Sequence, residues 1–155
     1  LPDSQLDRFT IRISMGYPSL KSEMAMIHSR QANGIDREIE QVCTVEEMCQ
    51  MQAECKNVHV ADSMLEYIVK LVAATRENSS IERGASPRAT LALTDMAKAH
   101  AYVKGQDYIT PDDVKIVFEH VIAHRILLTS EADIQGVKVS DVLEEIVKTV
   151  ATPKV

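Results

Sequence analysis

The chain has 155 residues and a formal net charge of -6, and 45% of its residues are hydrophobic while only 4% are aromatic. This length suits one domain, or one domain plus a piece of another, with an aliphatic core. The acidic balance argues against a nonspecific nucleic-acid binder and against a membrane-surface helix, because both need a basic face. No apolar run approaches the roughly 20 residues that span a bilayer.

Three cysteines, Cys43, Cys49 and Cys55, form an odd set without paired spacing. Such a set is typical of free thiols in a reducing compartment and predicts a cytoplasmic protein. Thiols six residues apart turn about 120° away from each other on a helix and do not converge on a metal. We expect them to be buried as small apolar residues. The chain opens at Leu1 rather than Met, so we expect a fragment of a longer protein.

The N-terminal part contains one strand pattern and one helix pattern. Residues 9–14, FTIRIS, alternate bulky apolar side chains with polar ones, which predicts a β-strand. The strands that pair with it should lie upstream of Leu1. A weakly amphipathic helix is expected to start at about Ser19, and Asn33-Gly34 should end it.

Two further helices are predicted after this region. Thr44 and Glu47 have the spacing of a capping box, so a helix should run from about Val45 to Lys56. Asp62 or Ser63 should cap the next helix, which we expect to be the most buried one because apolar side chains cover most of its circumference. These apolar positions are Met64, Leu65, Ile68, Val69, Leu71 and Val72.

A polar loop over residues 78–86 precedes a helix with well-marked ends. Ser86 is a good N-cap because its hydroxyl can accept from a free backbone N–H, and Pro87 suits the first helical position because it has no N–H. The helix should run to about Lys104, with Gly105 as its C-cap. Its many alanines should let a neighbouring helix approach closely.

Arg88 is out of place in the first turn of this helix. A cation there lies at the positive end of the helix macrodipole, which disfavours it by a few tenths of a kcal/mol up to about 1. Leu91 and Ala92 lie three and four residues further on, so no local carboxylate pairs with the arginine. An anion held by the free N–H groups and the guanidinium would compensate for this cost.

The C-terminal third begins with the same start signals. Thr110 should be an N-cap and Pro111 the first helical residue, with Asp112 and Asp113 at the favourable end of the dipole. A last short helix is expected over residues 140–150. The helix that begins at Pro111 should carry an apolar stripe formed by Val114, Val117, Phe118, Val121 and Leu128.

Two histidines and one arginine near this stripe could carry function. His120 and His124 are four residues apart, but no Glu lies between them as in HExxH and no third ligand is evident. We therefore interpret them as partly exposed helix histidines and expect no metal site. Arg125 lies near the middle of the stripe, so we expect a structural role with a carboxylate or carbonyl partner.

The residues that organise ATP hydrolysis are absent from this chain. No Gly is followed by Lys, so the phosphate-binding loop GxxxxGK[ST] is missing. No Asp is followed by Glu, so the acidic pair that would hold Mg²⁺ and a water at a strand end is missing as well. The chain by itself should therefore be unable to hydrolyse ATP.

Four segments read in order resemble the MoxR family of AAA+ ATPases: LPDSQLDRFTIRISMGYPS, YIVKLVAATR, GASPRATLAL and GQDYITPDDVKIVFEHVIAHRILL. The resemblance covers the chain from Leu1 to Pro153 and is to the C-terminal part of the family. It implies a mainly α fold, a helical-bundle AAA+ lid with a short N-terminal strand remnant of the α/β ATPase core. Residues 1–18 would be the end of the large domain, and residues 19–155 the helical lid.

The resemblance also implies roles for two arginines. Arg8, in LDRF, matches the arginine finger, which reaches the γ-phosphate held by the neighbouring subunit. Arg88, in GASPRA, matches the sensor-2 arginine of the lid, which contacts the phosphates of the subunit's own ATP. The alternative for Arg8 is a surface arginine paired with Asp3 or Asp7.

The family is one of chaperone-like, ATP-dependent remodelling machines, usually rings of six subunits. The resemblance thus implies ATP and Mg as cofactors, and both need the chain's own N-terminal ATPase domain to bind. It also implies a von Willebrand factor A domain protein as partner and no binding of nucleic acid. The fragment alone, lacking Walker A and Walker B, should be inactive. Two other interpretations remain open: a free-standing helical adaptor that binds a partner protein without nucleotide, and a helix-turn-helix regulator, which the acidic balance disfavours.

Overall fold

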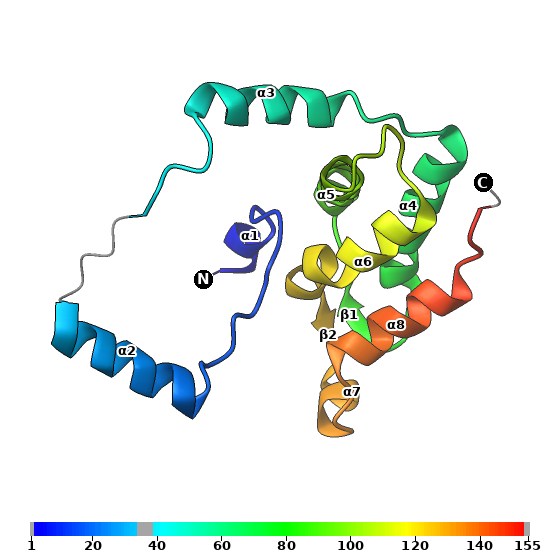
Figure 1. The fold of residues 1–155 in the computed structure, drawn as a ribbon. Helices are drawn as coiled ribbons and strands as arrows, with labels where there is room; N and C mark the ends of the chain where they lie inside the picture. The colour runs from blue at the N-terminus through cyan, green and yellow to red at the C-terminus, as the bar shows by residue number, and fades with distance from the viewer. Residues whose placement is uncertain (1, 34–38, 154–155) are drawn as a thin grey trace.

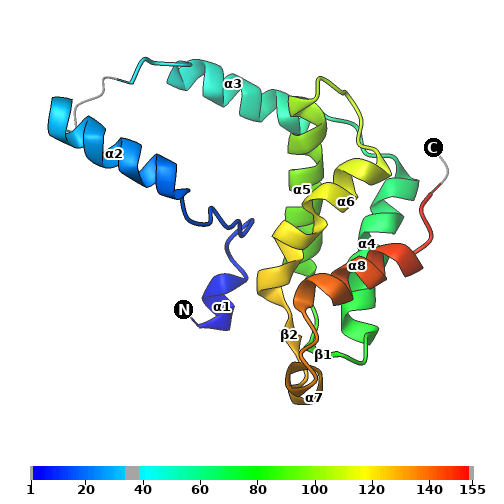
Figure 2. The same ribbon diagram turned by 60° about the horizontal axis from the view of Figure 1, so that its bottom comes forward.

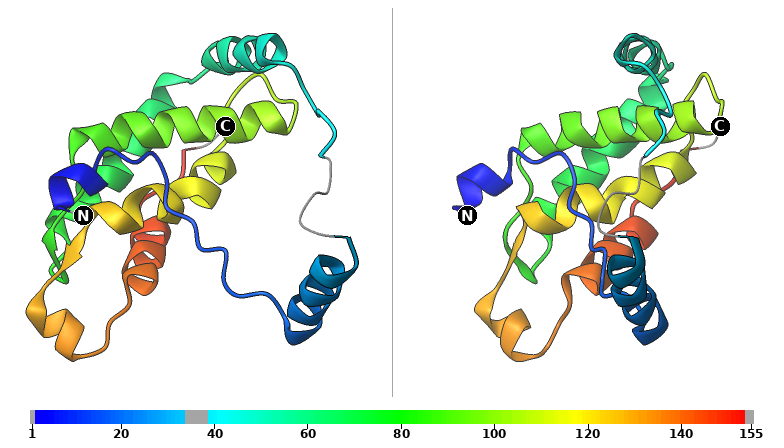
Figure 3. Two further views of the ribbon diagram at one scale, coloured as in Figure 1. Left: turned by 90° about the vertical axis from the view of Figure 1, so that its left-hand side faces the viewer. Right: turned by 60° about the vertical axis from the view of Figure 1, so that its left-hand side comes forward.

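The computed structural model describes residues 2–33 and 39–153. It is mainly helical, as predicted, with one two-stranded sheet (Figure 1). Figures 2 and 3 show α4, α5, α6 and α8 packed into one body, from which α2 stands apart. In chain order the elements are α1 (Asp3–Leu6), α2 (Leu20–Asn33), α3 (Val45–Lys56), α4 (Asp62–Glu77), β1 (Ile81–Arg83), α5 (Pro87–Val103), α6 (Pro111–Ile122), the 3₁₀ helix η1 (Ala123–Arg125), β2 (Leu127–Leu128), α7 (Ser130–Ile134) and α8 (Val139–Thr149).

Helix α6 lies at the centre of the helical body. Seven of its 12 residues are buried, compared with six of 16 in α4. The prediction that the α4 segment is the most buried helix was therefore wrong. Leu65 and Val69 on α4 are 41% and 53% exposed. Helix α6 is held between α5 and α8, whereas α4 packs on α5, α8 and β1 with one face left to solvent.

The predicted side-chain N-caps of α3 and α6 form, whereas those predicted for α4 and α5 do not. Thr44 and Thr110 form complete capping boxes, and the hydroxyl of Ser19 accepts from the backbone N–H three residues on, at 3.2 Å. Neither Asp62 nor Ser63 caps α4, because both already lie inside the helix. The preceding alanine takes the N-cap position without a side-chain hydrogen bond.

Helix α5 ends as its sequence predicts. Gly105 has a φ of 74°, and its N–H donates to the Tyr102 carbonyl at 2.8 Å. The next N–H, of Gln106, reaches back to the Ala101 carbonyl at 2.9 Å. This pair of bonds is the Schellman arrangement, which needs a left-handed residue at the glycine position. The small buried side chains of α5 accompany its close packing on α6, the most extensive helix pair of the structure.

The predicted polar loop between α4 and α5 contains a strand. β1 pairs antiparallel with β2, with Ile81 opposite Leu128 and Arg83 opposite Leu127. Ile81 is buried, which holds this stretch on the helical body. The apolar stripe of α6 therefore does not continue to Leu128, because the helix ends at Ile122 and the chain enters η1 and β2. The short helix α7 was not predicted.

The strand predicted for residues 9–14 does not form. The segment is irregular, with two backbone hydrogen bonds: from the Phe9 N–H to the Leu6 carbonyl at 3.1 Å, and from the Arg12 N–H to the His120 carbonyl at 2.9 Å. A strand needs a neighbour for its backbone groups, and no strand pairs with this segment within the described residues. Phe9 and Ile13 remain 54% and 64% exposed.

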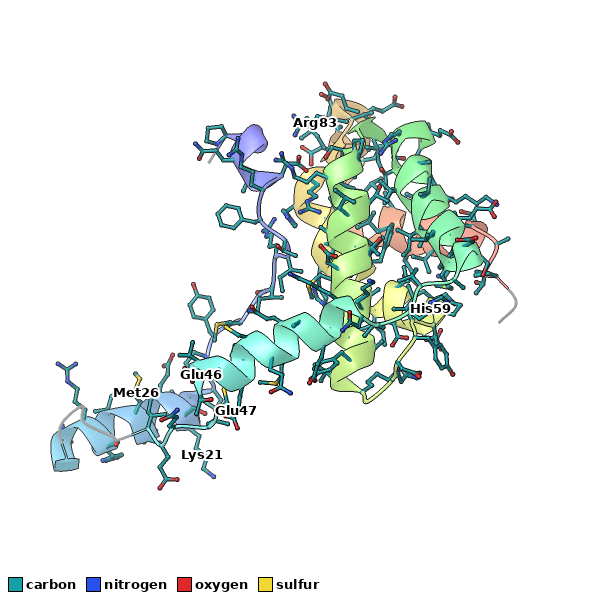
Figure 4. All side chains as sticks on the ribbon, turned by 90° about the horizontal axis from the view of Figure 1, so that it is seen from above. Lys21, Met26, Glu46, Glu47, His59 and Arg83 are labelled. Carbon is teal, nitrogen blue, oxygen red and sulfur yellow. The ribbon has the colours of Figure 1, made fainter. Side chains whose placement is uncertain are left out.

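Helices α2 and α3 lie outside the main body. Helix α2 ends at Asn33, and Gly34 lies outside the described residues. In Figure 4, the labelled Lys21 and Met26 extend from α2 far from the packed helices. Helix α3 lies against α5 but buries none of its residues completely.

The position of α3 on the outside of α5 leaves its two cysteines, Cys49 and Cys55, incompletely buried. Cys49 is exposed, and Cys43 and Cys55 are half-buried, so the prediction of three buried thiols was wrong. All three are free. Within residues 2–33 and 39–153, no helix combines the length and the apolar character needed to cross a membrane.

Gly84 lies where the chain passes the end of α4. A Cβ at this position would come within 2.7 Å of the Arg76 Cα and of the Thr75 carbonyl oxygen. The close approach lets Arg76 Nε donate to the Ala85 carbonyl at 2.8 Å, and the Ala85 N–H donate to Thr75 Oγ1 at 3.0 Å. These bonds fix the turn that leads directly into the first residues of α5.

A buried carboxylate joins α5 to α6. Oδ2 of the fully buried Asp113 accepts from the backbone N–H and the hydroxyl of Thr110, at 2.7 and 2.6 Å. Its Oδ1 accepts from His100 Nδ1 at 2.8 Å and from Lys104 Nζ at 3.3 Å. Burial acts to raise the pKa of Asp113, but the hydrogen bonds from Thr110, His100 and Lys104 outweigh it and lower the pKa from 3.8 to about 2.

Replacing Gly84 by Ala should lower the free energy of unfolding by about 1–3 kcal/mol, because the methyl group meets backbone atoms of α4 that cannot yield. Urea unfolding followed by circular dichroism measures this. Glu82→Ala, at an exposed position on β1, is the control and should change stability little. A Gly84→Ala protein as stable as the control would show that the turn relaxes freely.

Asp113→Asn should destabilise the protein at neutral pH and much less near pH 2. Because the folded pKa is lowered, the carboxylate stabilises the fold above its unfolded pKa of 3.8, and this contribution is lost as the pH falls through about 2. The shift corresponds to about 2 kcal/mol. Urea unfolding of both proteins at several pH values tests this, with exposed Asp112→Asn as control. A stability difference between wild type and Asp113→Asn that is independent of pH would contradict the assignment.

Candidate functional site

One end of the helical body brings together the predicted site residues. Asp7 lies at the junction of the N-terminal segment, the start of α5 and η1. Both of its carboxylate oxygens accept from Ser86 Oγ at 3.1 Å. Its Oδ1 lies 3.6 Å from Arg125 Nε, and its Oδ2 lies 4.0 Å from Arg88 Nη1. We refer to Asp7, Ser86, Arg88 and Arg125 as the Asp7 cluster.

Ser86 does not cap α5 in the way the sequence predicts. Its backbone has N-cap geometry, with φ −76° and ψ 167°, but its hydroxyl makes no bond to the first turn. The hydroxyl donates instead to Asp7, because an ionised carboxylate is a strong acceptor. Asp7 thereby places a negative charge at the N-terminus of α5, where the helix dipole favours it.

Arg125 is the buried cation of the Asp7 cluster. Its side chain is 1% exposed, and its Nη2 donates to the Phe9 carbonyl at 2.6 Å. The predicted kinds of partner, a carbonyl and a carboxylate, are therefore both present. Its Nε and Nη1 make no hydrogen bond within the described part of the chain. Burial lowers the pKa of Arg125, the charge of Asp7 opposes that change, and the charge of Arg88 adds to it.

The two arginines with predicted roles lie close to the Asp7 cluster and are open to solvent. The Arg88 side chain is 55% exposed, and its ion-pair contact to Asp7 is long. Arg8 is exposed, and no hydrogen bond or ion pair of its guanidinium is found among the described side chains. Asp3, the other partner considered for Arg8, has a side chain outside the described set. The labelled Arg83 in Figure 4, at the end of β1, marks this end of the molecule.

The two histidines considered for a metal site have separate environments. His124 is buried, and its Nε2 donates to the Phe9 carbonyl at 2.9 Å, the oxygen that Arg125 also contacts. His120 is exposed, so the two side chains do not share one environment, and the interpretation of both as partly exposed histidines was wrong for His124. Within residues 2–33 and 39–153, no group of three or more His, Cys, Asp or Glu side chains is arranged to hold a metal ion.

Sequence reasoning missed Asp7 and the Phe9 carbonyl as parts of the site. Asp7 is far from Ser86 and Arg125 in the sequence, so no local spacing rule could connect them. The available signal was the demand of Arg125 for a carboxylate and a carbonyl, together with the demand of the α5 N-terminus for an anion. Both demands are met by one segment, in which Asp7 and Phe9 lie on either side of Arg8.

Comparison with known proteins places these residues in a family. Residues 73–146 match the family model of the AAA lid domain. The chain is 35% identical over 153 residues to the uncharacterized protein YeaC of Bacillus subtilis, covering 99% of this chain and 48% of that protein. It is 32% identical over 164 residues to the chaperone MoxR1 of Mycobacterium tuberculosis, covering 100% of this chain and 43% of MoxR1.

A solved structure gives the same result for the fold. The crystal structure of a candidate ATPase from Cytophaga hutchinsonii is similar over 99% of this chain and 49% of that protein, with a TM-score of 0.89 and 30% sequence identity. The chain thus spans about half the length of the relatives that it matches. It belongs to the MoxR family of AAA+ ATPases and corresponds to their C-terminal region with the AAA lid domain.

Proposed function

We propose that this chain is the lid-bearing part of an ATP-hydrolysing, chaperone-like remodelling protein, in which Arg8 and Arg88 contact ATP phosphates. The observation that carries this proposal is the state of Arg88. It is a cation at the N-terminus of a 17-residue helix, it is 55% exposed, and its ion-pair contact to Asp7 is 4.0 Å long. A helix N-terminus with an accessible guanidinium is suited to a phosphate group.

Phosphoryl transfer would use the two arginines in different ways. Bound ATP and Mg²⁺ would supply the transferable phosphoryl group and neutralise part of its charge, on residues outside this chain. Arg88, as sensor 2, would hold the phosphates against the lid. Arg8, as the arginine finger, would stabilise the charge that develops in the transition state at a neighbouring subunit's site.

We further propose the domain division and the assembly that these roles require. Residues 1–18 would belong to the large ATPase domain, and residues 19–155 to the lid. The apolar side chains of the first segment support this: Met15 and Tyr17 are 95% and 98% exposed, as expected for a strip that the large domain covers. A finger acting on a neighbour's ATP requires an oligomer, for which we propose a ring of six. A von Willebrand factor A domain protein would be its partner.

In the full-length protein, Arg88→Ala should reduce ATP turnover or nucleotide affinity by about tenfold or more, because a charge-assisted phosphate contact is lost. Its free energy of unfolding should change by less than about 1 kcal/mol, since the arginine is exposed and its ion pair is long. Steady-state ATPase assays and thermal melts of the same preparation measure both.

Lys138→Ala is the matched control for Arg88→Ala. Lys138 is another exposed cation at a helix N-terminus, at the start of α8, and it makes no cap bond there. Its replacement should leave turnover unchanged. A destabilised Arg88→Ala protein with normal turnover per folded molecule would show that Arg88 is structural.

Arg8→Ala should leave ATP affinity within about twofold of wild type while lowering the turnover number by about a hundredfold or more, as expected for a group that acts mainly in the transition state. Nucleotide binding by fluorescence and turnover by phosphate release separate the two quantities. Arg12→Ala, four residues further along the same segment and also exposed, is the control. Normal turnover in Arg8→Ala would exclude the finger role.

A further inference from the structure

We propose that Asp7 is a positioning residue that holds the Arg8 segment to the start of α5, so that Arg8 and Arg88 move as one unit. This inference rests on the proposed function, in which both arginines contact ATP. It assigns a role to a residue that makes no phosphate contact itself, because its carboxylate is already engaged by Ser86 and Arg125.

Contacts hold the residues on both sides of Arg8. On one side, the Ser86 hydroxyl donates one bifurcated hydrogen bond to the Asp7 carboxylate, with both oxygens 3.1 Å away. On the other side, the Phe9 carbonyl accepts from His124 Nε2 at 2.9 Å and from Arg125 Nη2 at 2.6 Å. Arg8 itself is exposed. A short segment that is held at both neighbours presents the side chain between them in a defined direction.

The contacts come from elements that belong to the packed helical body. Ser86 is the N-cap residue of α5, two residues before Arg88, and the turn before it is fixed on α4 through the Ala85 carbonyl and Arg76. Arg125 ends η1, which continues directly from the central helix α6. A displacement of the start of α5 therefore displaces Asp7, and Arg8 with it.

The charges of the cluster explain why a carboxylate is needed at residue 7. The Arg125 side chain is almost fully buried, and two of its nitrogen atoms lack hydrogen bonds in the described chain, so it requires a nearby negative charge. The hydroxyl of Ser86 donates to the same carboxylate, and the positive end of the α5 dipole also faces it. An asparagine keeps the shape of this side chain, but it loses the charge that faces Arg125 and the helix dipole, and it accepts the Ser86 hydroxyl only as a weaker, neutral acceptor.

The test uses the full-length protein and two variants that weaken the cluster differently. Asp7→Asn removes the charge, and it also leaves Arg125 unpaired, which can lower the melting temperature. Ser86→Ala keeps the Asp7–Arg125 pair and removes only the bond to the start of α5; since Ser86 makes no cap bond, the helix should be little affected. Asp95→Asn, an exposed carboxylate on α5, is the control.

We expect Asp7→Asn and Ser86→Ala to lower the turnover number by about tenfold or more at temperatures where both are folded, because a small misplacement of a catalytic group has a large effect. The KM for ATP should change less than the turnover number. The residual turnover of the Arg8→Ala protein can be measured with radiolabelled ATP. Adding Asp7→Asn or Ser86→Ala to this protein should not lower its turnover further, because Asp7 acts through Arg8.

The possible results separate this inference from the function on which it rests. Arg8→Ala and Arg88→Ala proteins with normal turnover would overturn the proposed function itself. Impaired arginine variants beside normal Asp7→Asn and Ser86→Ala proteins would overturn the inference alone. Equal losses from Asp7→Asn with and without Arg8 would also overturn it, since Asp7 would then be only a stabilising residue.

Discussion

The buried carboxylate of Asp113 fixes α6 against α5, and the candidate site depends on that packing. It accepts from Thr110 at the start of α6 and from His100 and Lys104 near the end of α5, so it holds the two helices in one register. Because α5 is one continuous helix, the register set near its C-terminus also determines where its N-terminus lies. Arg88 begins that helix, and Arg125 follows directly after α6. The two cations of the Asp7 cluster are therefore brought together by an interaction at the opposite end of the helix pair.

Local signals in the sequence predicted most of the helices but not their relative burial. Thr44, Thr110 and Gly105 were readable because a cap is a contact between residues a few positions apart. The burial of α6 rather than α4 was not readable, since both segments are strongly apolar and only the packing of α5 and α8 decides which lies inside. The pairing of β1 with β2 was hidden for the same reason: it joins residues that are more than 40 positions apart.

The candidate site shows the same division between local and distant information. Arg88 was identified from its conflict with the helix dipole, and Arg125 from its place in an apolar stripe, because each conflict is visible within a few residues. The residue that resolves both conflicts is Asp7, which lies 79 positions from Ser86 in the chain. The predicted strand at residues 9–14 failed because alternation predicts a strand only where another strand is available to pair with it.

The presence of Asp7 beside Arg88 leaves the phosphate-binding hypothesis intact. A guanidinium has five N–H donors, and the ion-pair contact to Asp7 involves one nitrogen at 4.0 Å. The carboxylate accepts the bifurcated hydrogen bond of the Ser86 hydroxyl and lies closer to Arg125 than to Arg88. An incoming phosphate would thus join Arg88 without displacing Asp7 from its own partners. Asp7 offsets the charge of the buried Arg125, and Arg88, on the exposed side, keeps most of its donors for a ligand.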